Sequence, residues 1–145
     1  MAVTAFYYGV GVKKILQGSI DLDTDTFKAM LTTSAYTPDQ DVHDFRDDVT
    51  NEISGTGYSA GGVTISTPVV SYDTASNEVR WDFDDPSWTS ASFTARFLVV
   101  YKSRGGAASA DELVAYVNFG GDETVASGTF TYVVPSTGFS KITIS

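Results

Sequence analysis

Residues 92–103 read Ser-Phe-Thr-Ala-Arg-Phe-Leu-Val-Val-Tyr-Lys-Ser, and this stretch decides the predicted fold. The odd-numbered positions are all apolar (Phe93, Ala95, Phe97, Val99 and Tyr101), whereas the even-numbered ones are apolar only at Leu98 and Val100. Such alternation is typical of a β-strand, because successive side chains point to opposite faces of a sheet. No Pro or Gly interrupts the run, so it predicts the central strand of an antiparallel sheet, covered on both faces at its middle.

Similar runs separated by turn residues occur on both sides of this strand. They predict strands at residues 27–33, 63–72, 78–83, 113–119, 128–134 and 139–144, with Pro135-Ser-Thr-Gly138 as a hairpin turn between the last two. A chain of seven or eight short strands favours stacked sheets over alternating strands and helices. The predicted fold is therefore all-β: an antiparallel β-sandwich, jelly-roll or immunoglobulin-like, with one or two short helices.

The helices are expected in two places. Apolar residues between Phe6 and Leu16 fall partly at three- and four-residue spacing, which predicts a short helix ending near Gly18, although Gly9 and Gly11 weaken the pattern. Residues 19–25 alternate and resemble a strand with an acidic edge. The long polar segment 37–62 is expected to contain a helical turn near residues 43–48.

Length and composition limit the function classes. The 145 residues are about the size of one domain, residues 1–145, and there is no cysteine to form disulfides or thiolate sites. A net charge of −9 disfavours a nucleic-acid partner, because phosphate backbones repel an acidic surface. No apolar run approaches the roughly 20 residues of a membrane span, so we expect neither nucleic-acid nor membrane binding.

Two motifs could carry chemistry. Gly57-Tyr-Ser59-Ala-Gly61 matches the nucleophile turn of serine hydrolases, but a strand rather than a helix follows it, and the only histidine, His43, precedes the serine. A glycine-rich turn at a tight backbone crossing explains the motif better. The alternating Asp21, Asp23 and Asp25 could ligate Ca²⁺, yet the glycine and closing glutamate of a calcium loop are absent. We therefore predict no enzyme, catalytic residue, cofactor or metal site.

Aromatic residues could instead form a contact surface. Trp88, Tyr36 and Tyr58 could form a shallow platform for glycan stacking. Trp88 is a better surface candidate than Trp81, which lies in an alternating strand, but the core is favoured for both tryptophans. For a protein interface, residues 39–62 and 2–12 mix aromatic, small and polar side chains. The interaction residues predicted from these segments and their surroundings are Tyr7, Tyr8, Tyr36, Phe45, Tyr58 and Trp88.

A collinear set of short segments extends from about Lys13 through nearly the whole chain. It comprises residues 20–26 (Ile-Asp-Leu-Asp-Thr-Asp-Thr), 31–38 (Leu-Thr-Thr-Ser-Ala-Tyr-Thr-Pro), 43–45 (His-Asp-Phe), 48–52 (Asp-Val-Thr-Asn-Glu), 54–62 (Ser-Gly-Thr-Gly-Tyr-Ser-Ala-Gly-Gly), 88–89 (Trp-Thr), 95–102 (Ala-Arg-Phe-Leu-Val-Val-Tyr-Lys) and 117–120 (Val-Asn-Phe-Gly). This set resembles small virion structural proteins of tailed bacteriophages. The resemblance carries no functional residues with it.

The resemblance implies a non-enzymatic component of the virion, assembled in the host cytoplasm. The first expectation is a capsid decoration, or cement, protein that binds the assembled shell and stabilises it. Its partner would be the major capsid protein or another virion protein, and the chain would form a homo-oligomer, with a trimer favoured. A tail or adaptor component is the alternative within this class. A glycan-binding β-sandwich module is the alternative from another class.

Overall fold

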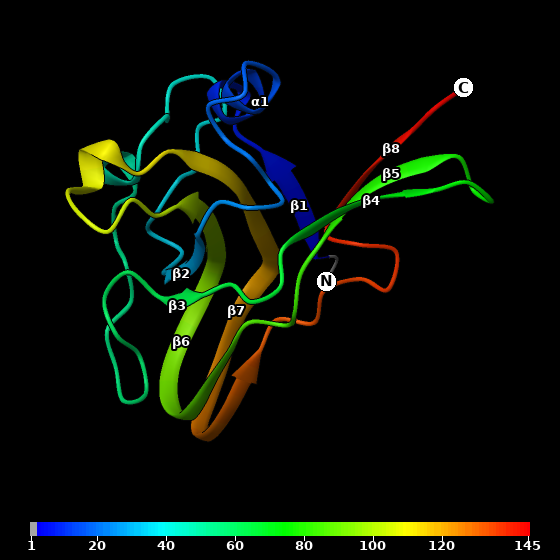
Figure 1. Ribbon diagram of the computed structural model, residues 1–145. Coiled ribbons are helices and arrows are strands. Elements are labelled where there is room, and N and C mark those ends of the chain that lie inside the picture. Colours follow the sequence, from blue (N-terminus) through cyan, green and yellow to red (C-terminus); the bar gives the residue numbers. More distant parts are fainter. Residues whose placement is uncertain (1–2) are drawn as a thin grey trace.

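The computed structural model describes residues 3–145 and is built mainly of antiparallel strands (Figure 1). The described elements, in chain order, are β1 (Thr4–Tyr7), α1 (Gly9–Leu16), β2 (Phe27–Thr32), the 3₁₀ turn η1 (Arg46–Asp48), β3 (Val63–Thr64), β4 (Val69–Asp73), β5 (Glu78–Asp82), β6 (Ser87–Lys102), the 3₁₀ turn η2 (Ala108–Ala110), β7 (Leu113–Thr131) and β8 (Ser140–Thr143). The predicted all-β, sandwich-like class with a short helix is confirmed.

The larger sheet has the order β1-β7-β6-β2-β3, with β6 at its centre. β6 pairs antiparallel with β2, where Met30 lies opposite Val99, and with β7, where Tyr116 lies opposite Val99 from the other side. The predicted central strand is thus confirmed, and it begins earlier than expected, at Ser87.

A bulge breaks the strict alternation expected along β6. Ala95 lies opposite Glu123 and Phe97 lies opposite Asn118, so the register with β7 shifts between them. Residues 119–122 of β7 therefore lie opposite Arg96 alone. Phe93 and Ala95 therefore share a core with Leu98 and Val100, whereas Phe97, Val99 and Tyr101 pack in a second cluster on the other face. The prediction of one continuous apolar face was wrong, because the bulge moves the alternation to the other face. The predicted cover on both faces at the middle of the strand is confirmed, since Leu98, Val99 and Val100 are all buried.

The β6–β7 pair bends back on itself and forms both layers of the body, as Figure 1 shows at the bottom of the view. Ser90 and Ser127 both have a φ of 49°, and the register shifts on each side of Ala91. The bend brings the end of β7 over its own beginning, so that the rings of Phe130 and Phe119 lie 5.8 Å apart. One long strand, β7, therefore replaces the two strands predicted at residues 113–119 and 128–134.

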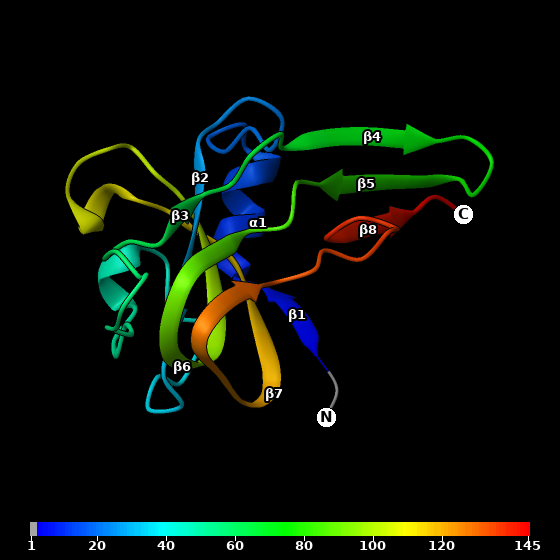
Figure 2. The ribbon, with the colours of Figure 1, turned by 90° about the horizontal axis from the view of Figure 1, so that it is seen from below.

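The smaller sheet, which we call the arm, consists of β4, β5 and β8 in the order β4-β5-β8. Figures 1 and 2 both show it extending away from the body, with the C-terminus at its far end. The single strand predicted at residues 63–72 is split between the two sheets, because Thr67 adopts a φ of 50° and Pro68 cannot donate a ladder hydrogen bond. β8 pairs with β5, so the predicted hairpin with the preceding strand was also wrong.

The N-terminal prediction is half confirmed. α1 runs over the predicted helical residues up to Leu16, but residues 4–7 form an edge strand paired with β7. Close packing of α1 on β7 explains the glycine at position 11, since a Cβ there would lie 2.5 Å from the Leu113 carbonyl oxygen. Residues 19–25 form a turn rather than the predicted strand, closed by a backbone hydrogen bond from Asp25 to Asp21.

Candidate interaction surface

The two faces of the arm differ sharply in character. Cross-strand pairing places Val70, Tyr72, Val79 and Ile142 on one face, because Val70 pairs with Trp81, Tyr72 with Val79, and Val79 with Ile142. Tyr72 is 54 % exposed and Ile142 is 67 % exposed. An uncovered apolar sheet face of this kind marks a protein contact more often than a free surface.

The apolar face continues into a groove beside α1. This arm groove has a volume of about 350 Å³ and is lined by Tyr7, Val12, Ile15, Leu16, Leu22, Val70, Val79, Arg80, Trp81, Ser140, Lys141 and Ile142. Leu16, at the last helical position of α1, is 83 % exposed. The helix and the arm therefore form two walls of one largely apolar surface.

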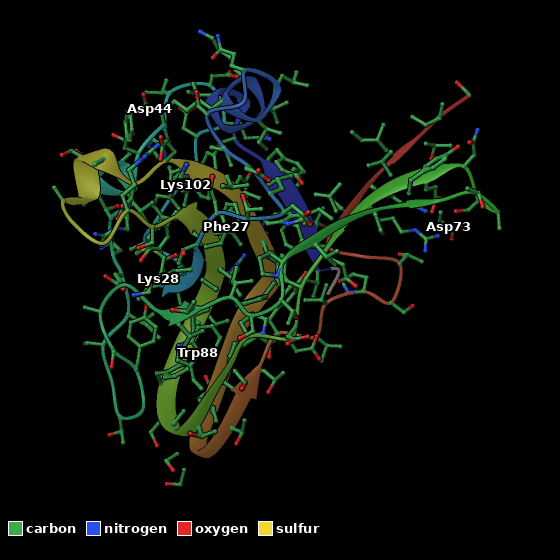
Figure 3. All side chains as sticks on the ribbon, in the orientation of Figure 1. Phe27, Lys28, Asp44, Asp73, Trp88 and Lys102 are labelled. Atoms are coloured by element: carbon green, nitrogen blue, oxygen red, sulfur yellow. The ribbon has the colours of Figure 1, made fainter. Side chains whose placement is uncertain are left out.

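The opposite face of the arm carries an ion-pair network centred on Glu78. Its carboxylate accepts hydrogen bonds from Lys141 Nζ at 2.8 Å and from Arg80 Nη2 at 2.7 Å, and Arg80 also pairs with Asp73 at 3.1 Å. Figure 3 shows Asp73 near the far end of the arm, well away from Phe27 and Trp88 in the body. These hydrogen bonds, first from Lys141 and then from Arg80, lower the pKa of Glu78 to about 2.

We expect the Glu78→Gln substitution to change how stability depends on pH. The carboxyl has an ordinary pKa of 4.5, so the unfolded chain takes up a proton there before the folded chain does. The stabilisation from Glu78 is therefore complete above pH 4.5 and is lost as the pH falls toward 2. Urea unfolding at a series of pH values should show this loss in the parent chain and a smaller loss in Glu78→Gln.

The matched control is Glu123→Gln, at an exposed carboxylate of β7 that has no ion pair among residues 3–145. It should keep the parent pH profile. Equal acid sensitivity in the parent chain and in Glu78→Gln would contradict the role of the network.

Two of the predicted interaction residues are buried in a hydrogen-bonded chain. The hydroxyls of Tyr8 and Tyr36 are 2.8 Å apart, and the Tyr36 hydroxyl lies 3.0 Å from Nδ1 of His43. The Asp39 amide also donates to this Nδ1, so the nitrogen accepts and the Tyr36 hydroxyl donates to it. Burial raises the pKa of Tyr8 and raises that of Tyr36 to about 12. Both tyrosines thus stabilise the fold and provide no contact surface in this chain.

The predicted glycan platform is not formed. Trp88 is buried and stacks with Tyr58 at a centroid distance of 6.4 Å, and Tyr36 lies in the core described above. Tyr58 is half-buried, and its hydroxyl donates to Glu52 at 2.7 Å while accepting from the Leu31 amide. Rings that pack on each other in this way cannot present their faces to a sugar. Trp81 is buried, as expected.

The remaining two predicted residues lie at the surface only in part. Tyr7 is half-buried, lines the arm groove and hydrogen-bonds to Ser140 of β8. Phe45 is half-buried beside η1, and Lys14 of α1 lies 3.8 Å above its ring centroid. Of the six predicted residues, Tyr7 alone belongs to the arm groove.

The residues of the two motifs considered for chemistry lie in a loop and in a turn. Ser59 is exposed in a loop, and no hydrogen bond joins it to His43 in the described part of the chain. Asp21 and Asp25 accept backbone hydrogen bonds within their turn, and Asp25 pairs with Lys102 at 2.7 Å. Among residues 3–145, no group of three His, Asp or Glu side chains is placed to hold a metal ion. None of the helices described over the same range is long and apolar enough to cross a membrane.

The exposed residues of the arm lie outside the predicted set, because that set consists of aromatic side chains from residues 2–12 and 39–62 and their surroundings. The available signal was the spacing of Val70 and Tyr72, and of Ile142 and Ile144, in strands whose other face is charged. The same alternation, however, is also typical of a strand whose apolar face is buried against a second sheet.

Comparison with known proteins adds no relative, since no family model, curated protein or solved structure matches the chain.

Proposed function

We propose that this chain is a non-enzymatic virion structural protein of a tailed bacteriophage, and that it binds the assembled capsid shell as a decoration protein. The observation that carries the binding role is the exposed apolar surface formed by the arm and the end of α1. The virion context rests on the sequence resemblance alone. The proposed partner is the major capsid protein or another virion protein, and the proposed location is the virion.

Exposed apolar side chains on this surface cost free energy in water. Tyr72, Ile142 and Leu16 keep apolar atoms in water, and burying apolar area yields roughly 25 cal/mol per Å². A shell that presents a complementary surface only after assembly would gain stability from each bound copy, as any ligand stabilises the state that it binds. Projection of the arm from the body allows it to reach across a joint between shell subunits.

The test is co-sedimentation of the purified chain with capsids that lack it. The parent chain should sediment with these capsids, and the double variant Leu16→Asp/Tyr72→Asp should remain in the supernatant. The control Val42→Asp changes a residue that is 69 % exposed on the loop before η1 and should sediment normally.

Three outcomes decide between the alternatives. Failure of the parent chain to bind shells, together with its recovery in tail fractions, would favour the tail or adaptor role. Unchanged binding of the double variant would show that the arm is not the contact surface. Binding to neither particle would overturn the virion proposal.

A further inference from the structure

We propose that two copies of this chain associate through the free edge of β8, across a two-fold axis at Ile142, and join their arms into one continuous sheet. This inference concerns the chain alone and does not depend on the virion role. It replaces the trimer expected from the sequence with a two-fold dimer.

The backbone groups of β8 alternate in direction between β5 and the outer edge of the sheet. β8 is an edge strand whose described pairing is with β5 alone. The Ile144 amide donates to the Asn77 carbonyl at 2.8 Å, so Ile144 faces β5 with its backbone groups. Because these groups alternate in direction along an antiparallel strand, Ile142 also faces β5, whereas Lys141 and Thr143 direct theirs outward. The outer edge thus presents the backbone amides and carbonyls of two alternate residues, which have no strand partner among residues 3–145.

The outward backbone groups define the register that a second copy would adopt. An antiparallel pair centred on Ile142 places Lys141 of each copy opposite Thr143 of the other, and these are the residues with outward backbone groups. Each such pair exchanges both of its hydrogen bonds. The edge is therefore complementary to itself, as a two-fold interface requires.

The side chains of β8 are compatible with this register. The two Ile142 side chains would lie next to each other on the apolar face, where each is now 67 % exposed. On the other face Lys141 would lie beside Thr143 rather than beside the second Lys141, which avoids a like-charge pair. The Ile142-centred register thus buries apolar area and introduces no opposed charges.

Charge favours the arm over other surfaces for self-association. The chain carries a net charge of −9, so most surfaces of two copies repel each other. The three strands of the arm contain the acidic Asp73, Glu78 and Asp82 and the basic Arg80 and Lys141, which gives a net charge of only −1. The arm is therefore a region where two copies approach each other with little repulsion.

The arrangement also leaves room for the two bodies. The body lies at the Ser140 end of β8, and the C-terminus lies at the free end of the arm (Figure 2). Antiparallel pairing therefore places the bodies at opposite ends of the joined sheet. It also brings both apolar faces into one wider surface, as the joined strands share the same pleat.

An open β8 edge with alternating Ile142 and Ile144 is otherwise a hazard. Exposed edge strands pair readily with other chains, and proteins usually protect them with charges, prolines or bulges. β8 has only Lys141 as a protecting charge. Pairing with a second copy closes this edge in both chains.

The first experiment measures the mass of the purified chain by light scattering across a concentration series. The parent chain should approach twice 15.5 kDa. Ile142→Lys should shift the mass to that of one chain, because two ammonium groups would meet at the axis. Val42→Lys, at a side chain of nearly equal exposure outside the arm, should keep the parent mass. Circular dichroism checks that both variants stay folded.

The second experiment tests the register directly and uses the absence of native cysteine. In a non-hydrogen-bonded antiparallel pair the Cα atoms are about 4.5 Å apart, a separation that a disulfide spans. Ile142→Cys should therefore form a disulfide-linked dimer under mild oxidation much faster than Val42→Cys.

A parent chain that stays monomeric or forms only trimers would overturn the proposal, as would a dimer that survives Ile142→Lys. Equal cross-linking rates for the two cysteine variants would exclude the Ile142-centred register. Because no capsid is present in either measurement, a failure here is distinguishable from a failure of shell binding.

Discussion

Replacing Gly62 with alanine is expected to lower the free energy of unfolding by about 3 kcal/mol or more, from overpacking and left-handed backbone strain together. A Cβ at Gly62 would lie 1.8 Å from the Ala29 carbonyl oxygen and 2.7 Å from the Met30 Cα. These atoms belong to β2, next to the central strand, so they have little freedom to move. The φ of Gly62 is +78°, which adds strain for any residue with a side chain.

The matched control is Gly105→Ala. Gly105 has nearly the same φ, +77°, but no atom lies within 4 Å of the position of its Cβ. This variant should therefore show only the backbone penalty of about 1–2 kcal/mol. Urea unfolding followed by tryptophan fluorescence measures both values. Similar losses in the two variants would contradict the steric role of the crossing at β2.

The central part of the fold could be predicted because its strands alternate without interruption. β2, β5 and the core of β6 were expected within a few residues of their observed bounds, and each combines β-branched or aromatic residues with clear turn signals at its ends. The glycine-rich turn also had the predicted role of a tight crossing, which Gly57 performs against β6, since a Cβ there would lie 2.7 Å from the Thr89 carbonyl oxygen.

The connectivity at the bends could not be predicted from the sequence. Gly120 and Gly121 follow the strand predicted at residues 113–119, but they belong to the bulge opposite Arg96 and β7 continues through it. A glycine pair permits both a turn and a bulge, and the choice depends on the partner strand. The pairing of β8 with β5 rather than with β7 is likewise a long-range choice that local turn chemistry does not determine.

The candidate surface was missed for a related reason. Tyr8, Tyr36 and Trp88 were among the predicted interaction residues, yet the bent β6–β7 pair and the segments packed on it bury them. Ile142 and Tyr72 have the sequence pattern of core residues but lie on a sheet that extends beyond the body. Exposure here depends on how far the arm projects, and alternation in the sequence carries no information about that distance.

Trp81 attaches the arm to the body, and we expect Trp81→Ala to cost about 3–5 kcal/mol. This β5 side chain is only 3 % exposed. Its ring lies 5.3 Å from that of Phe27 in β2 and 5.4 Å from that of Phe139, next to β8. Its Nε1 donates to the Leu22 carbonyl at 2.9 Å. Loss of the ring removes contacts to both sheets at once and leaves a cavity where they meet.

The variant should also release the arm before the body unfolds. Arg80 and Lys141 lie in adjacent strands of the arm, so tryptic cleavage after them should accelerate more than cleavage after Lys102 in β6. Tyr72→Ala is the control, since Tyr72 lies on the same face but is 54 % exposed, and it should change stability by less than about 1 kcal/mol. If Trp81→Ala unfolded with uniform cleavage across the chain, the arm and the body would be one cooperative unit. In that case Trp81 would act as an ordinary core residue, and the arm would not move independently of the body.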